Sequence, residues 1–339
     1  MIKTSKITKI SSLEDRIFEI TNEKDFNETA IEVFYFQYSH NILYRQYCDL
    51  LHCRPDLINR IEDIPFLPVS FFKTHFIKTT VFEPEVIFES SGTSGSATSR
   101  HLVKSADLYR HSYLNAFRLF YGAPSDYCIL ALLPSYLEKG NSSLVYMVKG
   151  WMQQSGHPAN GFYLHNYTEL AAALAGLEQK EQKTLLIGVT YALLDFAALF
   201  PQPLKHTMIM ETGGMKGRMK EIVRSEVHEQ LMEAFGVETV QSEYGMTELL
   251  SQAYAKEGGS FSTPPWMKVV LRDEDDHRSV LSVANGTLTG GLNIIDLANL
   301  YSCGFIATED VGRLRSDGTF EVLGRMDNTD IRGCSLLAL

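Results

Sequence analysis

The sequence predicts an α/β fold with mostly parallel sheets flanked by helices, joined to a smaller strand-rich subdomain. Apolar segments of strand length alternate with helical segments from residue 86 onward. After about residue 265, short segments separated by Gly, Asp and Asn replace this alternation. Buried strands alternating with helices are typical of a doubly wound parallel sheet, because the crossover helices cover its faces. A chain of 339 residues is expected to form one large domain or two.

Residues 1–85 are predicted to form a mainly helical lead-in. Ser12, with Asp15 three residues later, matches the pattern of a helix N-cap and its partner acid. The stretch from Asn27 to Leu51 carries apolar residues at helical spacing. The prolines of Pro65-x-x-Pro68 disfavour helix in the residues before them, so we expect extended backbone there.

Residues 86–265 are predicted to form the α/β core. The strand candidates are Val86–Phe88, His101–Lys104, Tyr127–Leu133, Thr184–Val189 and His206–Met210. The helix candidates between and after them are Ala106–Phe120, Ser142–Gln154, Tyr191–Phe200 and Met219–Ala234. A further strand begins near Thr239 and runs into a glycine-containing turn.

Residues 266–339 are predicted to form the strand-rich subdomain, which ends in a tail that contains a cysteine. The short strand candidates here are Lys268–Leu271, Thr287–Leu292, Gly304–Ala307 and Phe320–Leu323.

Composition excludes several classes of function. The net charge is −10 and no long block of Lys and Arg occurs, which argues against a nucleic-acid-binding surface. No apolar run of about 18 residues and no signal-peptide pattern is present, so no membrane span is expected. Five cysteines, an odd number without a Cys-x-x-Cys pair, indicate reduced thiols in a cytoplasmic protein.

A hydroxyl- and glycine-rich loop follows the first predicted strand of the core. It reads Ser90-Ser91-Gly92-Thr93-Ser94-Gly95 and is closed by Arg100. Glycine lets the backbone turn its N–H groups inward as a nest for anions, and the hydroxyls add donors. The loop lacks the Gly-Lys-Ser/Thr tripeptide of a P-loop. Taken alone, it fits a polyphosphate-binding loop and also fits a plain surface loop.

Four more clusters follow predicted strands. They are Gly213-Gly214, Tyr244-Gly245-Met246-Thr247-Glu248, Thr308-x-Asp310-x-Gly312-Arg313 and Gly324-Arg325-x-Asp327. Open α/β sheets bind ligands at the edge where their strands end, so these positions are candidates for a nucleotide site. Each cluster taken singly also fits a solvated turn.

The order of these motifs, with the hydroxyl-rich loop first, resembles the adenylate-forming superfamily of acyl-CoA synthetases and luciferase-like ligases. The resemblance extends from Glu89 to Gly333. It implies that the loop holds the β- and γ-phosphates of ATP, that Thr247 contacts the transferred phosphoryl group, and that Glu248 binds Mg²⁺. Carboxylate attack on phosphate brings two anions together, and cations and fixed N–H dipoles must neutralise them.

The resemblance also implies where the nucleoside lies. Tyr244 and Gly245 resemble part of the adenine pocket, with Gly213-Gly214 on its other side. Asp310 is similar to the acceptor for the ribose hydroxyls, and Arg325 is similar to the cation near ribose and phosphate.

The chain departs from the superfamily pattern in three places. Thr98-Ser99-Arg100 closes the loop where lysine preceded by proline is usual, and Glu309 stands where many members have glycine. The sequence ends at Leu339 without the mobile C-terminal domain that carries a catalytic lysine. A cysteine, Cys334, stands close to the end instead.

These departures resemble the bacterial acyl-protein synthetases of the fatty-acid reductase system, the LuxE-like proteins. That resemblance implies activation of a fatty acid as acyl-AMP, transfer to Cys334 as a thioester, and delivery to an acyl reductase or another acceptor. Two alternatives stay open. One is an acyl-CoA or aryl-acid ligase that releases its acyl-AMP to an external thiol, and the other is a catalytically silent, nucleotide-binding partner subunit.

Overall fold

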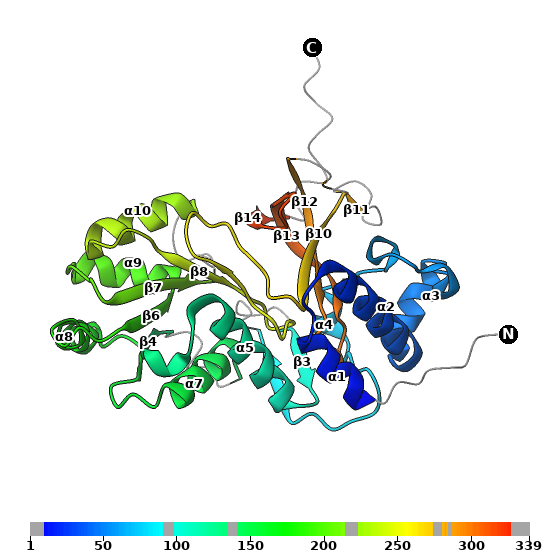
Figure 1. Ribbon diagram of the computed structural model, residues 1–339, viewed down its shortest axis with the longest axis horizontal. Helices are drawn as coiled ribbons and strands as arrows, with labels where there is room; N and C mark the ends of the chain where they lie inside the picture. The colour runs from blue at the N-terminus through cyan, green and yellow to red at the C-terminus, as the bar shows by residue number, and fades with distance from the viewer. Residues whose placement is uncertain are drawn as a thin grey trace, which may run out of the picture.

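A sheet of mostly parallel strands forms one half of the molecule (Figure 1). In the computed structural model, the described residues are 10–90, 98–133, 141–213, 223–273, 280–281, 283 and 286–326. The strand order of this sheet is β5-β4-β6-β7-β8-β9, and only the pairing of β8 with β9 is antiparallel. Its strands are β4 (Cys128–Leu132), β5 (Gly161–Tyr163), β6 (Thr184–Val189), β7 (Thr207–Thr212), β8 (Gln241–Tyr244) and β9 (Ala253–Ala255). We call it the parallel sheet.

Helices cover both faces of the parallel sheet (Figure 1). Helices α5 (Ala106–Tyr121) and α7 (Ser143–Ser155) lie on one face, and α9 (Thr190–Leu199) and α10 (Arg224–Phe235) lie on the other. Side-chain caps set the starts of the first pair, because Ser105 and Ser142 each accept a backbone N–H three residues on. The α/β class is thereby confirmed, and the predictions of α5, α7 and α9 were accurate to within one residue at each end. Helix α10 begins at Arg224, five residues after the predicted start at Met219, and Met219 itself lies outside the described residues.

Strands β5 and β9 and helix α8 (Tyr167–Glu178) of this half were not predicted. Each of the two strands has three residues and α8 is rich in alanine, so none of them produces a distinct apolar period.

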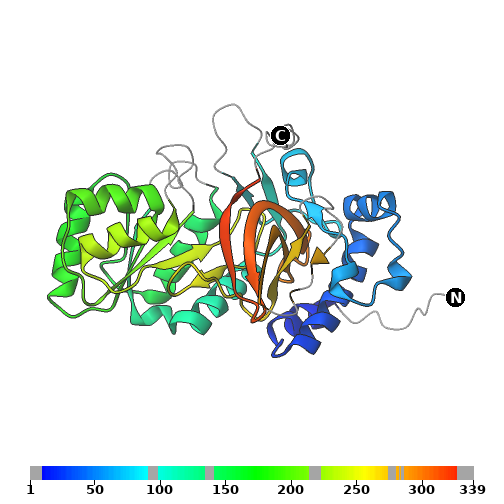
Figure 2. The same cartoon turned by 90° about the horizontal axis from the view of Figure 1, so that it is seen from above.

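A second, mostly antiparallel sheet stands beside the first and separates it from the N-terminal helices (Figure 2). It contains β1 (Leu67–Pro68), β10 (Met267–Arg272), β11 (Val280–Leu281), β12 (Thr287–Asp296), β13 (Phe305–Arg315) and β14 (Phe320–Arg325). Strand β1 pairs with β13 in parallel, and so the extended backbone expected at Pro65-x-x-Pro68 includes a strand of this sheet. We call it the antiparallel sheet. A separate hairpin joins β2 (Val86–Glu89) to β3 (Arg100–Val103).

The N-terminal helices differ from the sequence prediction in two details. The apolar stretch from Asn27 to Leu51 is divided between α2 (Glu23–His40) and α3 (Ile42–Leu50). Asn41 separates them, because its backbone is extended and its side chain accepts the N–H of Tyr44 as the cap of α3. The described part of α1 (Ile10–Phe18) already includes Ser12, so the prediction of Ser12 as an N-cap was wrong. The short elements η1 (Pro55–Leu57), η2 (Ile61–Asp63), α4 (Phe71–Thr74) and η3 (Pro124–Asp126) complete the described chain.

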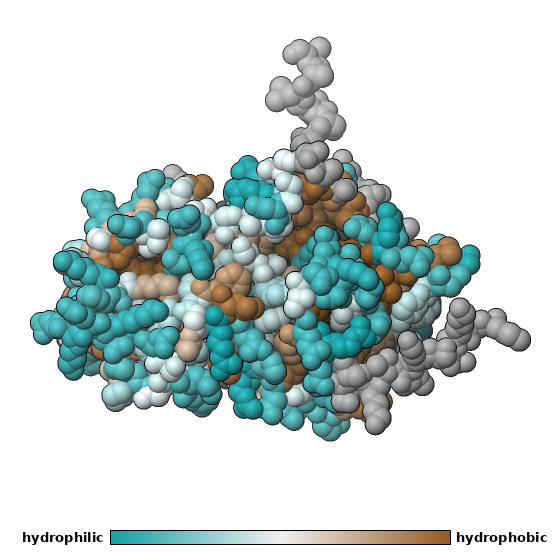
Figure 3. Space-filling model, in the orientation of Figure 1, coloured by the Kyte–Doolittle hydropathy of each residue, from teal (hydrophilic) through white to brown (hydrophobic). Residues whose placement is uncertain are grey.

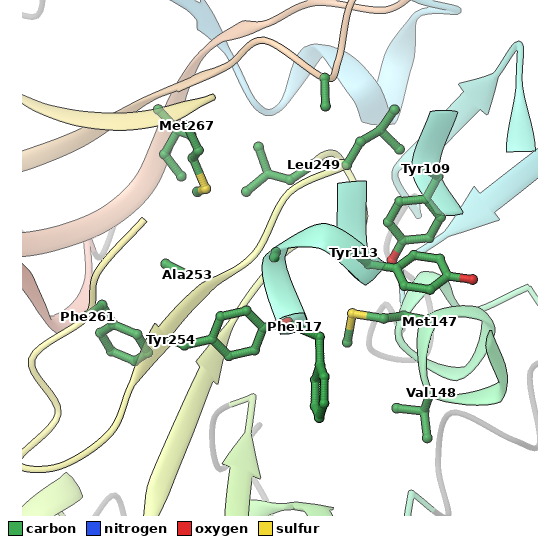
Figure 4. Close-up of a cluster of buried hydrophobic side chains, with 14 of the residues drawn as sticks. Tyr109, Tyr113, Phe117, Met147, Val148, Leu249, Ala253, Tyr254, Phe261 and Met267 are labelled. Atoms are coloured by element: carbon green, nitrogen blue, oxygen red, sulfur yellow. The ribbon is translucent and has the colours of Figure 1, made fainter. Parts of the chain in front are cut away.

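One continuous hydrophobic core joins the two sheets and the N-terminal helices. Figure 4 shows its central part, where Tyr113 and Phe117 of α5 lie among Met147 of α7, Tyr254 of β9 and Leu249. Leu249 is fully buried, and it directly follows Glu248 in the chain. The segment that carries this predicted site residue is therefore anchored in the core.

Hydrophilic side chains cover most of the face seen in Figure 3, with apolar areas between them. Among the described residues, no helix is both long enough and apolar enough to cross a membrane.

Candidate active site

The hydroxyl-rich loop joins β2 to β3, and the structure describes both of its ends. The hairpin pairing ends at Glu89 and Arg100. Beyond that pair, the N–H of Ser90 donates to the carbonyl oxygen of Ser99 at 3.0 Å, and the N–H of Ser99 donates to Oγ of Ser90 at 2.9 Å. These two hydrogen bonds hold the ends of the loop together. The predicted phosphate-binding residues Ser91, Gly92, Thr93, Ser94 and Gly95 lie outside the described residues.

Glu248 lies in the segment that follows β8 and comes close to the base of this loop. Its side chain is buried, and it forms a hydrogen bond with the Ser99 side chain. Burial raises the pKa of the Glu248 carboxyl, and the Ser99 bond and the charges of Lys73 and Arg325 offset part of that rise. A buried carboxylate is stabilised in its charged form by any further cation that reaches it. Thr247 precedes it and is half-buried.

Asp310 and Arg325 reach the same region from the antiparallel sheet. They are register partners on β13 and β14, and Nε of Arg325 lies 3.5 Å from Oδ1 of Asp310. The hydroxyl of Tyr244, at the end of β8, donates to Oδ2 of Asp310 at 2.7 Å. This hydrogen bond links the two sheets directly, so residues more than sixty positions apart in the chain form one cluster.

The structure explains why glycine stands at two positions of the predicted adenine pocket. Gly213, at the end of β7, has a φ of 72°, which side chains disfavour. A Cβ at Gly245 would lie 2.5 Å from Oε1 of Glu243, so a larger residue there would have to displace the buried carboxyl. Gly214 lies outside the described residues.

Two buried carboxyl groups, Glu211 and Glu243, lie beneath this edge of the parallel sheet. Burial raises the pKa of Glu243 to about 7, and the nearby charge of Glu211 adds to the rise although Thr212 donates a hydrogen bond to Glu243. Glu211 behaves in the opposite way. Burial acts to raise its pKa, but the hydrogen bond with His228 and the charge of Arg224, whose Nε lies 3.0 Å from Oε1, lower it overall.

The sequence reasoning assigned no role to three residues that the structure places at the site. Lys73 of α4 acts on Glu248 by charge, and its Nζ lies 3.6 Å from Oε1 of Glu309. His101 of β3 has Nδ1 2.8 Å from the carbonyl oxygen of Thr247, and Nδ2 of Asn299 donates to the carbonyl oxygen of Glu248 at 2.7 Å. The available signal for all three was a polar residue inside an apolar segment.

Arg100, predicted as the cation that closes the loop, lies 4.5 Å from the ring centroid of Phe76. This is a cation–π contact, with the guanidinium over the face of the ring. The cations whose charge reaches Glu248 are Lys73 and Arg325. A role for Arg100 on phosphate stays a prediction.

Cys128 and Cys303 are fully buried and belong to the core. Cys334, the predicted acyl acceptor, lies outside the described residues.

The donor set fits a magnesium ion that is shared with phosphates. Among the residues that the structure describes, no group of three or more His, Cys, Asp or Glu side chains is arranged to hold a metal ion. Mg²⁺ in nucleotide sites is usually held by one or two carboxylates together with substrate phosphates and water. Glu248 is the candidate for such a carboxylate.

Comparison with known proteins places these observations in context. The family described as "Acyl-protein synthetase, LuxE" matches residues 2–118. A long-chain-fatty-acid–luciferin-component ligase from Photorhabdus luminescens is 34% identical over 103 residues, which cover 28% of this chain and 88% of the relative.

Solved structures of adenylate-forming ligases share the fold. ATP-bound MatB from Rhodopseudomonas palustris aligns with a TM-score of 0.53 and 16% identity, over 73% of this chain and 50% of that chain. MenE, the O-succinylbenzoate coenzyme A synthetase from Bacillus subtilis in complex with ATP and magnesium, aligns with a TM-score of 0.52 and 18% identity, over 73% and 51%. A 2-hydroxyisobutyryl-CoA ligase in the postadenylation state aligns with a TM-score of 0.63 and 12% identity, over 92% and 70%. The chain spans about half the length of the first two.

Proposed function

The chain belongs to the LuxE family of acyl-protein synthetases, and from this premise we propose that it activates a fatty acid with ATP and carries the product as a thioester on Cys334. Glu248 is the observation on which the proposal depends. This buried carboxyl group contacts the base of the hydroxyl-rich loop and feels the charges of Lys73 and Arg325. A site that must gather phosphates, a metal ion and a second carboxylate needs these components together.

In the first step, an oxygen of the fatty-acid carboxylate attacks the α-phosphorus of ATP. A new C–O–P linkage forms, the bond between the α-phosphorus and its bridging oxygen breaks, and pyrophosphate leaves. No protein base is required, because the attacking carboxylate is already ionised at neutral pH. Arg325 and Lys73 offset the charge that accumulates, and a Mg²⁺ ion held through Glu248 would supply Lewis-acid stabilisation of the phosphates.

The nucleoside is held by residues at the junction of the two sheets. We assign the ribose hydroxyls to Asp310, which Tyr244 orients by its 2.7 Å hydrogen bond. We assign the adenine to the space bounded by Tyr244, Gly245 and Gly213, where the absence of a side chain on Gly213 lets a flat ring approach the backbone.

In the second step, the Cys334 thiolate attacks the acyl carbon of the adenylate. A C–S bond forms, the C–O bond to AMP breaks, and AMP leaves, while the thiol proton has already passed to solvent. Cys334 stands nine positions after Arg325, so an extended chain of that length reaches at most about 30 Å. That reach lets the thioester travel from the adenylation site to an acceptor protein, for which we propose an acyl reductase. A cytoplasmic location stays a prediction.

Mass spectrometry of the intact protein tests the transfer step. After incubation with ATP, Mg²⁺ and mixed fatty acids, we expect the wild-type mass to rise by one acyl group, which hydroxylamine removes and peptide mapping places on Cys334. Cys334→Ser should lose the acyl group and retain acid-dependent ATP–pyrophosphate exchange. Cys53→Ser, a partly exposed cysteine of the N-terminal region, serves as the matched control and should acylate like the wild type.

The same experiment separates the alternatives. Undiminished acyl transfer by Cys334→Ser to coenzyme A would support a ligase that uses an external thiol. No pyrophosphate release with any acid would support a silent nucleotide-binding subunit.

A further inference from the structure

His101 is a buried histidine whose hydrogen bonds determine where its proton lies. Its exposure is 1%, and its Nδ1 is 2.8 Å from the carbonyl oxygen of Thr247. A carbonyl oxygen only accepts, so Nδ1 carries the hydrogen. Burial lowers the pKa of His101 to about 4, so the ring is neutral at physiological pH and its Nε2 is a bare acceptor.

The hydrogen bond of Asn299 likewise fixes the orientation of its side chain, on the other side of Glu248. It is fully buried, and its Nδ2 donates to the carbonyl oxygen of Glu248 at 2.7 Å. Rotating the amide by 180° would bring Oδ1 against that carbonyl oxygen, which is a second acceptor. The observed orientation is therefore fixed, and Oδ1 of Asn299 points elsewhere.

Both remaining acceptors, Nε2 of His101 and Oδ1 of Asn299, are buried without a hydrogen-bond partner in the described structure. The two side chains lie close enough that a proton on Nε2 would interact with Asn299, but with Nε2 bare two acceptors cannot bond each other directly. Buried polar atoms without partners are uncommon and usually mark a water molecule or an ion. His101 and Asn299 line the same cavity, whose volume of about 10 Å³ is the size that holds one water molecule. A water molecule has two O–H groups, which matches two acceptors.

We propose that one buried water molecule bridges His101 and Asn299, and that these two side chains are positioning residues for the Glu248 carboxylate. His101 fixes the peptide group before Glu248, and Asn299 fixes the one after it. The water molecule satisfies the far side of both side chains and thereby holds them in these orientations. This inference rests on the proposed function only in giving Glu248 its role.

Two substitutions of His101 distinguish positioning from packing. His101→Asn places an amide N–H close to where Nδ1–H lies and keeps the donor to Thr247, whereas His101→Leu fills similar space and removes it. We expect His101→Leu to lower acid-dependent ATP–pyrophosphate exchange at least tenfold, and His101→Asn to remain within about threefold of the wild type. His165→Leu, at an exposed histidine, is the control and should leave exchange unchanged.

Two further measurements do not depend on activity. Nitrogen NMR of the protein labelled at histidine should show the His101 ring protonated at Nδ1 and unprotonated at Nε2. A crystal structure should show one ordered water molecule within hydrogen-bond distance of Nε2 of His101 and Oδ1 of Asn299. If Nε2 carries the proton, if the cavity is dry, or if both variants lose exchange equally, the proposal is wrong. Absence of exchange in the wild type, with the tautomer and the water found as expected, would count against the proposed function alone.

Discussion

The segment after β8 and the edge formed by β13 and β14 meet at the same site, but different forces hold them. Buried side chains fix the backbone of the first region. His101 donates to the carbonyl oxygen of Thr247, and Asn299 donates to the carbonyl oxygen of Glu248. The N–H groups of Leu250 and Ser251 donate to Oδ2 of Asp296 at 2.7 and 3.1 Å. At the second region, Asp310 pairs with Arg325 at 3.5 Å, and the Arg325 side chain is 71% exposed.

The difference indicates a division of labour in the proposed reaction. A metal-binding carboxylate must keep one position, and buried hydrogen bonds provide it because each one would be costly to leave unmade. The cation that follows the charge developing on the phosphate must be able to move with it. The exposed Arg325 side chain keeps the conformational freedom that this requires. The four predictions below test this contrast, from the largest expected effect to the smallest.

Glu248→Gln removes the charge from the buried region while keeping its shape. We expect acid-dependent ATP–pyrophosphate exchange to fall by about 10²- to 10³-fold, the loss that follows when one preorganised electrostatic group is removed. The control is Glu229→Gln on the exposed side of α10, which should exchange at the wild-type rate. Exchange within threefold of the wild type in Glu248→Gln would remove Glu248 from the mechanism.

Glu243→Gln tests whether the buried side of the site carries a cost in stability. The pKa of Glu243 is raised from 4.5 to about 7 in the folded protein, so between these values the folded state holds a proton that the unfolded state has released. The stability that the protonated Glu243 contributes is therefore lost as pH rises through that window, and the free energy of unfolding falls by about 3 kcal/mol in total. Glutamine stays neutral and should remove this dependence.

Urea unfolding at pH 5 and pH 8 measures this effect. The stability of Glu243→Gln relative to the wild type should increase by about 2 to 3 kcal/mol between the two pH values. Glu257→Gln, at an exposed position, should show no such trend. An equal difference at both pH values would contradict the raised pKa.

Tyr244→Phe cuts the hydrogen bond that joins the two regions. Loss of a bond to a charged acceptor is worth about 1.5 to 3 kcal/mol, so we expect kcat/KM for ATP to fall at least tenfold. The effect should appear mainly in the KM for ATP, because Asp310 is assigned to the ribose. A fall confined to kcat would place Asp310 at the reacting phosphate instead.

Arg325→Met should have the smallest effect on folding. Exposed ion pairs contribute about 0 to 1 kcal/mol, so the free energy of unfolding should change by no more than about 1 kcal/mol. Thermal or urea unfolding of the purified variant provides the measurement. A loss above about 3 kcal/mol would mean that Arg325 is a structural residue and that the contrast between the regions does not hold.

The sequence predicted the parallel sheet well because its strands are buried on both faces. Strands β4 and β6 are buried at every residue, so they appear as apolar runs between helical segments. It predicted the separation of α2 from α3 poorly, since Asn41 acts through one side-chain cap that leaves the apolar period intact. The pairing of β1 with β13 was also missed, because it joins residues far apart in the chain.

The site was predicted to a similar extent. Glu248, Asp310 and Arg325 stand in recognisable motifs, and the structure brings them together. His101 and Asn299 could not be found in this way, because their contacts are with backbone atoms of another segment. Such contacts leave no pattern in the local sequence.

Acid-dependent exchange of labelled pyrophosphate into ATP tests the central claim most directly, since it reports adenylate formation before any thiol acts. With the wild-type chain, Mg²⁺ and a panel of fatty acids of increasing length, we predict exchange that requires the acid and is unchanged in Cys334→Ser. A folded protein that binds ATP and shows no exchange with any acid of the panel would contradict the account.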